Sequence, residues 1–167
     1  MHTKLPSESR LTKEFRHFQE FPIEGVHFEL QDDDIYHWNV TIVGPLDTFL
    51  ENGLLKASMV FPKTFPVDPP VFKFTNSFHH PNIYPSGEVR ISILHPSNNV
   101  SYSGGYTQDE VWTAAFGPEA IVISIISLLF QPDLSLCANL DAAIEFREDR
   151  SVYEEKIREI LLCSWDE

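Results

Sequence analysis

The chain has 167 residues, 43% of them hydrophobic and 13 of them phenylalanine, which is enough to bury the core of one domain. Its 12 basic and 25 acidic residues give a net charge of −13, and so acidic a chain is expected to repel nucleic acids and anionic membranes. It contains no run of about 18 apolar residues and no basic-then-apolar leader, so we expect a cytoplasmic or nuclear protein without a membrane span.

The first predicted element is an amphipathic helix that begins at Ser7 or Ser9, either of which can cap it. Pro22 prevents the helix from continuing past Phe21. Its apolar stripe recurs at helical spacing at Leu11, Phe15 and Phe18. The remaining side, which we expect to be exposed, carries the basic residues Arg10, Lys13 and Arg16.

Four strands are predicted next, over residues 26–30, 35–43, 54–61 and 71–74. Short turns, one of them rich in aspartate, join the first strands, so we expect them to pair as an antiparallel meander. Between the third and fourth strands, four prolines in the ten residues 61–70 exclude a helix and a central strand. This segment is therefore predicted to be a rigid, extended crossing.

Three helices are predicted after a polar loop at 97–110. The first begins at Pro118 and is apolar nearly all round, which indicates a buried central helix. The second is capped by Asn139, and the third by Ser151 with a glutamate three residues later. A block of strands followed by a block of helices predicts an α+β fold, and the lack of a linker or repeat predicts a single domain over 1–167.

Several segments resemble the ubiquitin-conjugating enzyme family in order and spacing. They are the basic first helix, the Phe-Pro-x-x-Phe-Pro-x-x-Pro-Pro crossing at 61–70, His80-Pro81-Asn82, Trp112 before the central helix, and Asn139-Leu140-Asp141-Ala142-Ala143. The resemblance covers essentially the whole chain. It implies the UBC-like fold, a four-stranded antiparallel meander with an N-terminal helix, a buried central helix and two C-terminal helices.

The segment from Ile91 to Glu110 is similar to one subclass of the family, although it carries few acids. That subclass has an extended loop beside the active site and serves cullin-RING or endoplasmic-reticulum degradation ligases. The resemblance also places Arg90 where the family has the cysteine that carries ubiquitin as a thioester. A guanidinium stays protonated and offers no free lone pair, so position 90 is expected to form no thioester.

The other residues around this position have roles that the resemblance implies. Asn82 matches the asparagine that stabilises an oxyanion and braces a nearby loop, and without the nucleophile we favour bracing. His80 orders the turn, and Leu136 stands at a gate position where the family has an acid or a serine. Cys137 is either a displaced nucleophile or an incidental cysteine, the more common state. The two cysteines of the chain, Cys137 and Cys163, suit neither a disulfide framework nor a zinc site, so we expect no metal or cofactor.

The family binds its activating enzyme and RING-type ligases through the first helix and two loops. The matching positions here are Arg10, Lys13, Pro66, Val67, Trp112, Thr113 and Ala114. Val67 is smaller than the phenylalanine often found there, and a loop proline is missing after Thr113, so the resemblance implies weakened RING binding. Trp112 fits core packing as well as a partner contact.

Two interpretations of the chain remain open. In the first, the cysteine was lost naturally, and the chain is a non-catalytic binding module for ubiquitin or a ubiquitin-like protein. Independent departures from the family pattern at Leu136, at 113–117 and in the acid-poor loop favour this interpretation. In the alternative, the chain is an active ubiquitin transferase of the extended-loop subclass, either engineered at position 90 or using Cys137.

Overall fold

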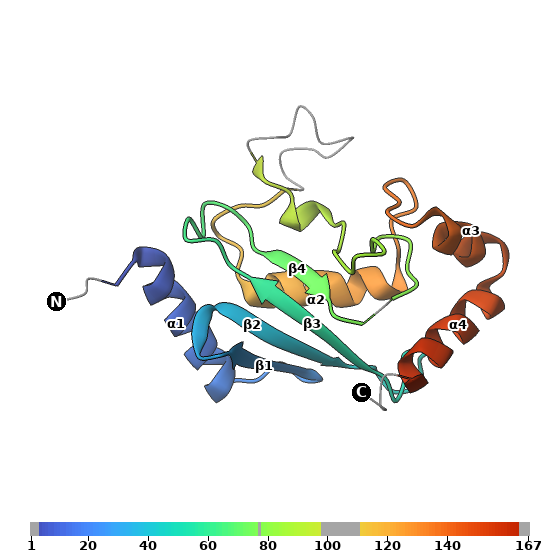
Figure 1. Cartoon of the computed structure of the whole chain (residues 1–167), viewed down its shortest axis with the longest axis horizontal. Coiled ribbons are helices and arrows are strands. Elements are labelled where there is room, and N and C mark those ends of the chain that lie inside the picture. Colours follow the sequence, from blue (N-terminus) through green and yellow to red (C-terminus); the bar gives the residue numbers. More distant parts are fainter. Residues whose placement is uncertain (1–3, 77, 98–110, 164–167) are drawn as a thin grey trace.

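The computed structural model describes residues 4–76, 78–97 and 111–163 (Figure 1). Its elements in chain order are α1 (Pro6–Glu20), β1 (Val26–Gln31), β2 (Asp34–Val43), β3 (Leu54–Val60), β4 (Val71–Phe74), the 3-10 helix η1 (Ser92–Leu94), α2 (Pro118–Phe130), α3 (Leu140–Glu148) and α4 (Arg150–Cys163). The four strands form one antiparallel sheet in the order β1-β2-β3-β4, which confirms the predicted α+β meander. The predicted polar loop at 97–110 lies outside the described residues except for Ser97.

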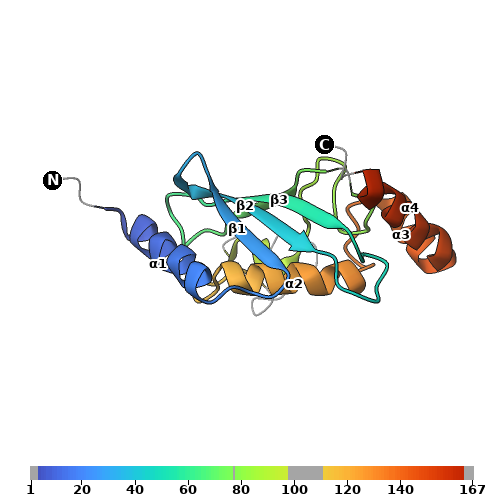
Figure 2. The ribbon, with the colours of Figure 1, turned by 90° about the horizontal axis from the view of Figure 1, so that it is seen from below.

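One row of paired residues shows how the sheet builds the core. Phe28 pairs with Val40, Val40 with Ala57, and Ala57 with Phe74, so the row crosses all four strands. All four side chains are buried because they point to the same face, as the two-residue period of strands requires. Figure 2 shows α2 running across this face, with α1 at one end and α3 and α4 at the other.

The start of α1 differs from the predicted serine cap. The helix begins at Pro6, one residue after Leu5, and no side chain caps it. Proline suits this position because it lacks the N–H that would otherwise be left unpaired. The Ser7 hydroxyl is buried and instead hydrogen bonds the Tyr36 hydroxyl of β2 at 2.9 Å. Ser7, which was predicted as a possible cap, therefore connects the helix to the sheet.

The central position of α2 is confirmed, with one exception on its surface. Ile121, Val122 and Ile125 are fully buried, as the nearly all-apolar sequence predicts. Ile123, however, is 51% exposed, so one side of the helix remains open. Within the described ranges, neither this helix nor any other has the length and apolar character needed to cross a membrane.

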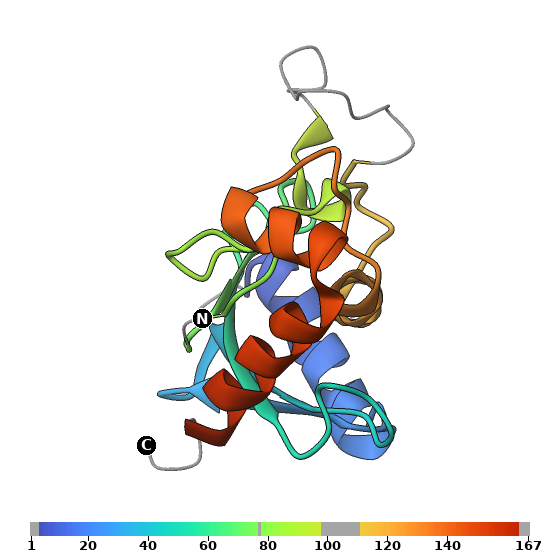
Figure 3. The ribbon, with the colours of Figure 1, turned by 90° about the vertical axis from the view of Figure 1, so that its right-hand side faces the viewer.

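Asn139 caps α3 as predicted, since its side-chain oxygen accepts from the backbone N–H of Ala142. The prediction for α4 was wrong: the helix begins at Arg150, and the carboxylate of Asp149 accepts from the backbone N–H of Val152. Aspartate is as good a helix cap as serine, so the helix can begin at the aspartate, two residues before the predicted serine. The pair of helices forms one end of the molecule (Figure 3).

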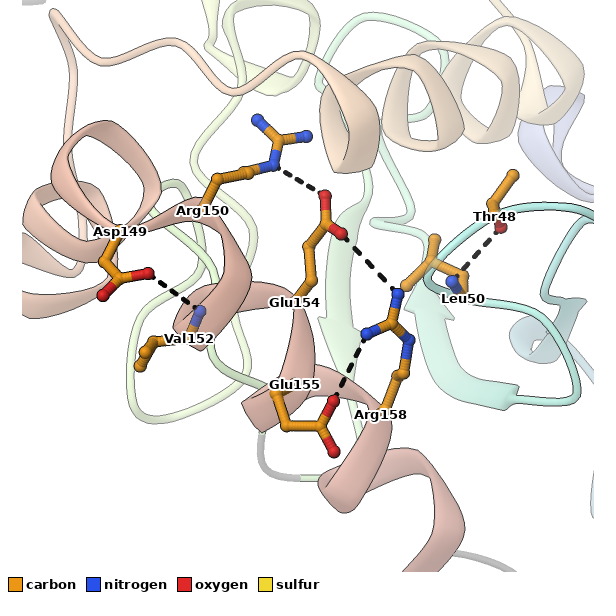
Figure 4. A network of polar contacts seen from close by, with 8 residues as sticks. All are labelled: Thr48, Leu50, Asp149, Arg150, Val152, Glu154, Glu155 and Arg158. Atoms are coloured by element: carbon orange, nitrogen blue, oxygen red, sulfur yellow. Dashed lines mark hydrogen bonds and ion pairs between the residues drawn. The ribbon is translucent and has the colours of Figure 1, made fainter.

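A ladder of charged side chains runs along α4. Glu154 pairs with both Arg150 and Arg158, at 2.9 and 3.6 Å (Figure 4). The guanidinium of Arg150 also lies 3.9 Å from the centre of the Phe146 ring, which joins α4 to α3. A second link between these helices is the ion pair of Lys156 with Glu145, and chiefly for this reason the pKa of the Glu145 carboxyl is lowered.

Candidate functional site

A tight turn sets the direction of the chain into Arg90. Gly87 has φ +91°, and a Cβ there would lie 2.1 Å from the carbonyl oxygen of Phe74, so only glycine fits. After the turn, Val89 forms an isolated bridge with Ile83. The backbone N–H of Arg90 then donates to the carbonyl of Asn82 at 2.7 Å. The two residues that the sequence singled out are thus neighbours through the backbone.

The side chain of Asn82 is fully buried, and its whole amide is occupied. Its nitrogen donates to the carbonyls of Asp133 and Leu136 at 2.8 and 3.2 Å. Its oxygen accepts from the backbone N–H of Asp133 at 2.9 Å. Because both amide hydrogens have partners, the side chain holds the loop between α2 and α3 in place.

His80 is also fully buried, and it fixes the other side of the same turn. Its Nε2 lies 3.0 Å from the carbonyl oxygen of Leu128, which can only accept, so Nε2 carries the hydrogen. Its Nδ1 then accepts from the backbone N–H of Asn82 at 3.0 Å. Burial, the largest effect, lowers the pKa of His80 to about 4, so the ring is neutral at physiological pH.

The side chain of Arg90 reaches the loop between α2 and α3. Its Nη1 donates to the carbonyl of Cys137 at 3.4 Å. The thiol of Cys137 is partly exposed and donates to the carbonyl of Leu134 at 3.1 Å. The structure therefore brings together the five residues that the sequence selected for this site: His80, Asn82, Arg90, Leu136 and Cys137.

An open groove of about 610 Å³ begins beside Arg90. Its walls come from the proline-rich crossing, from the start of β4, from the segment 88–91 around Arg90, and from η1. Apolar groups dominate the walls, among them Pro69, Pro70 and Leu94. Groups that can carry charge are Asp68, Glu88, Arg90 and His95.

A second set of predicted residues gathers at the α1 end of the molecule. Arg10 donates through its two terminal nitrogens to the carbonyls of Ala114 and Phe116, at 2.6 and 2.8 Å. Trp112 is 1% exposed, and its indole N–H donates to the carbonyl of Pro66 at 2.9 Å. These bonds tie helix α1 and the proline-rich crossing to the segment 111–116.

Only some of this second set can be reached by a partner. The expectation that Arg10 lies on an exposed face is corrected, because its side chain is partly buried and its guanidinium is committed to two carbonyls. Val67, by contrast, is 73% exposed, and Lys13, Thr113 and Ala114 are exposed as well.

One residue of the site around Arg90, Asp133, was not predicted from the sequence. Asp133 donates its backbone N–H to Asn82, and its carboxylate accepts from the hydroxyl and the N–H of Ser135. An aspartate followed two residues later by serine is a local turn signal, so the turn itself could be found in the sequence. Its pairing with Asn82, 51 residues away, could not.

The chain is similar to known proteins over nearly its whole length. A family model described as "Ubiquitin-conjugating enzyme" matches residues 10–161. Ubiquitin-conjugating enzyme E2 15 of Schizosaccharomyces pombe is 42% identical over 157 residues, which cover 93% of each chain. Ubiquitin-conjugating enzyme E2 13 of Arabidopsis thaliana is 41% identical over 148 residues, or 88% of this chain and 89% of its own. Ubiquitin-conjugating enzyme E2 7 of the same plant is 40% identical over the same shares.

Proposed function

The chain belongs to the ubiquitin-conjugating enzyme family, and from that premise we propose that it is a non-catalytic member that binds ubiquitin or a ubiquitin-like protein. The observation that carries the proposal is Arg90, whose backbone is bonded to Asn82 and whose guanidinium is bonded to Cys137. If position 90 is where the family has its thioester cysteine, this chain has a cation there in place of a nucleophile.

The chemistry of the family reaction requires a thiolate. A thiolate attacks the carbonyl of the incoming thioester and later leaves when a lysine amine attacks in turn. The Arg90 guanidinium is protonated at any workable pH and has no lone pair to form either bond. Binding can persist without the reaction, because the surfaces that recognise partners do not depend on the sulfur.

The state of Asn82 supports the same proposal. An oxyanion needs a donor that is aimed at it and not otherwise engaged. Both hydrogens of the Asn82 amide are already donated to the carbonyls of Asp133 and Leu136. The side chain of Leu136 has no group that could deprotonate an incoming amine. Asn82 therefore braces the loop, and position 136 supplies no general base. Both features fit a binding module better than a transferase.

The decisive experiment is a charging assay. The purified chain is incubated with a ubiquitin-activating enzyme, ubiquitin and ATP, and the products are separated on a non-reducing gel. We expect no thiol-sensitive ubiquitin adduct on the natural chain or on Arg90→Ala, and an adduct on Arg90→Cys. A thiol-sensitive adduct on the natural chain would overturn the proposal.

A second candidate function is favoured by one contact, the hydrogen bond between Arg90 and the carbonyl of Cys137. This contact puts a partly exposed thiol beside the proposed site. In such a transferase the Cys137 thiolate would attack the thioester carbonyl of the activating enzyme, whose own thiolate would leave. Cys137→Ala separates the two functions, because it would abolish an adduct formed at Cys137. Cys163→Ala is the matched control and should leave any such adduct unchanged.

Membership of the family also points to an activating enzyme and a RING-type ligase as partners. The exposed Val67, Thr113 and Ala114 supply the surface on which we propose that a ligase docks. Val67 offers less apolar area than an aromatic residue, so this docking is weak. Assignment to the extended-loop subclass stays part of the proposal, since residues 98–110 of its loop lie outside the described residues.

A further inference from the structure

A carboxylate on α3 joins two other elements of the fold. The Nε2 of His79 lies 2.8 Å from Oε2 of Glu145, and since an ionised carboxylate can only accept, Nε2 carries the hydrogen. The other oxygen of Glu145 pairs with the ammonium of Lys156 on α4. We call these three residues the Glu145 bridge. It connects α4, through α3, to the turn that contains His80 and Asn82.

The charges around His79 make its protonation depend on Lys156. The titratable groups near His79 come from three elements: Glu145 of α3, Tyr153, Lys156 and Glu159 of α4, and His80 of the turn. Burial keeps two of them uncharged, because it lowers the pKa of His80 to about 4 and raises the pKa of Tyr153. The hydrogen bond from Lys156 is the largest of the effects that lower the pKa of Glu145. Lys156 is therefore the cation that offsets the carboxylate beside His79.

We propose that Lys156 is a site of lysine acetylation, and that the Glu145 bridge transmits the loss of its charge to the turn by holding a proton on His79. In the acetylation step, the uncharged amine of Lys156 attacks the carbonyl carbon of an acetyl thioester. A C–N bond forms, the C–S bond breaks, and the thiol leaves with the proton of the amine. The resulting amide is uncharged, so the Glu145 carboxylate loses its cation. A carboxylate without that cation favours the imidazolium form of His79.

Lys156 is accessible, and it is placed differently from the other lysines. Its side chain is 45% exposed, and it lines a cavity of about 310 Å³ together with His79. Among the described residues, Lys4 is the one other lysine that pairs with a carboxylate, and its partner Glu8 lies in the first turn of α1. Acetylation of the other lysines therefore removes no ion pair that reaches the turn.

Acetylation of Lys156 should move Glu145 from one partner to the other. Helix α4 loses its ion pair with Glu145 but keeps the cation–π contact of Arg150 with α3, so the helix loosens without detaching. The His79 imidazolium binds Glu145 more strongly than the neutral ring does, which holds the turn more firmly against α3. None of these steps involves Arg90, so they hold whether or not the chain binds ubiquitin.

The test follows the ring protons of His79 by NMR as the pH is varied, with the signal assigned from its loss in His79→Gln. In the chain acetylated at Lys156 during synthesis, we expect the titration midpoint of His79 to rise by about half a pH unit. Lys156→Gln, which is also uncharged, should show the same shift, and Lys156→Arg, which keeps the charge, should not. Lys4→Gln breaks a lysine–glutamate pair outside the bridge and should titrate like the natural chain.

The same titration in a Glu145→Gln background shows whether the carboxylate carries the effect. There, acetylation of Lys156 should leave the midpoint of His79 unchanged, because the bridge is already broken. A shift of the same size in this background would mean that the charge acts by another route and would overturn the role of Glu145. An unchanged midpoint in the acetylated chain that retains Glu145 would overturn the proposal.

Two further measurements address the modification and its consequence. Mass spectrometry of the folded chain after treatment with acetyl-coenzyme A should find the acetyl group on Lys156. Its absence there, with the exposed Lys13 acetylated, would overturn the assignment of the modification site. In the acetylated chain, hydrogen exchange at Ile157 on α4 should be about threefold faster, as expected for the loss of one partly exposed ion pair. Exchange at Ile83, whose N–H donates to the His80 carbonyl, should be slower, and unchanged exchange at both amides would rule out the movement of Glu145 between partners.

Discussion

At the scale of single residues, burial decides the charge of His80. Its ring is enclosed, with one nitrogen donating to Leu128 and the other accepting from Asn82, so there is no position for a second proton. The pKa is about 4 in the folded chain and near its ordinary value of 6.5 in the unfolded chain. Between these values the unfolded chain binds more protons than the folded chain, so the free energy of unfolding falls as the pH falls.

This linkage gives the first prediction. Between pH 7 and pH 5 we expect His80 to remove about 2 kcal/mol from the free energy of unfolding measured with urea. His80→Gln should be less stable at pH 7 but should lose less on acidification, because it carries no group that titrates in this range. The exposed His27 provides the control, since His27→Gln should keep the pH dependence of the natural chain. A His80→Gln chain with the full pH dependence would contradict the assignment.

Asn82 gives the second prediction. Asn82→Ala removes three hydrogen bonds that hold the loop between α2 and α3, and we expect a loss of about 3 kcal/mol in the free energy of unfolding. The backbone N–H of Asp133 loses its acceptor, so its hydrogen exchange should accelerate more than that of distant amides. Asn139→Ala, which removes a single helix-capping bond, should cost about 1 kcal/mol and leave the exchange of Asp133 unchanged.

What the sequence could predict at this scale depended on distance along the chain. The turn at Gly87 and the cap at Asn139 follow from residues within three or four positions. The family resemblance suggested only that Cys137 could lie near position 90, and the hydrogen bond between the two residues, which spans 47 positions, was not predicted. The neutral state of His80 could not be predicted at all, because it depends on enclosure by α2.

At the scale of elements, Arg10 acts as a clamp between α1 and the segment 113–116. Its two terminal nitrogens reach two different carbonyls, which a lysine ammonium at the end of a single chain is less able to span. Lys13 on the same helix is exposed, with no hydrogen bond or ion pair to the described residues. Arg10 and Lys13, which were both predicted to lie on the exposed face of the helix, therefore have different roles.

The third prediction separates these tasks. Arg10→Gln should lower the free energy of unfolding by about 2 kcal/mol and speed hydrogen exchange at Phe116, whose N–H lies in the clamped turn. Lys13→Gln should leave both quantities unchanged and affect only the association with an acidic partner surface. Equal stability of the two variants would mean that the clamp contributes nothing to folding.

The helix starts show why sequence patterns located elements better than their ends. Strands and helices depend on apolar periodicity over many residues, and all four strands and four helices were found. A helix start depends on a single competing side chain, and here Pro6 and Asp149 prevailed over the predicted serines. The 3-10 helix η1 was missed because three residues carry no periodic signal.

At the scale of the whole molecule, two electrostatic effects oppose each other. The net charge of −13 makes the folded chain repel itself, since folding brings the acids together. Local ion pairs work in the opposite direction, notably those of Glu154 with Arg150 and Arg158 (Figure 4). These pairs are partly exposed to solvent, and each such pair contributes about 0–1 kcal/mol. A few pairs of this size cannot offset the repulsion of so large a net charge.

The fourth prediction follows from this comparison. Salt screens charges beyond about 10 Å at 0.1 M, so it weakens the long-range repulsion more than the close pairs. We therefore expect the melting temperature at pH 7 to rise when sodium chloride is increased from about 20 to about 200 mM. Glu154→Gln removes one acid and breaks two pairs, so it should be less stable than the natural chain at low salt by no more than about 1 kcal/mol. A melting temperature that fell with salt would mean that the ladder on α4, and not the net charge, controls the electrostatic stability of this domain.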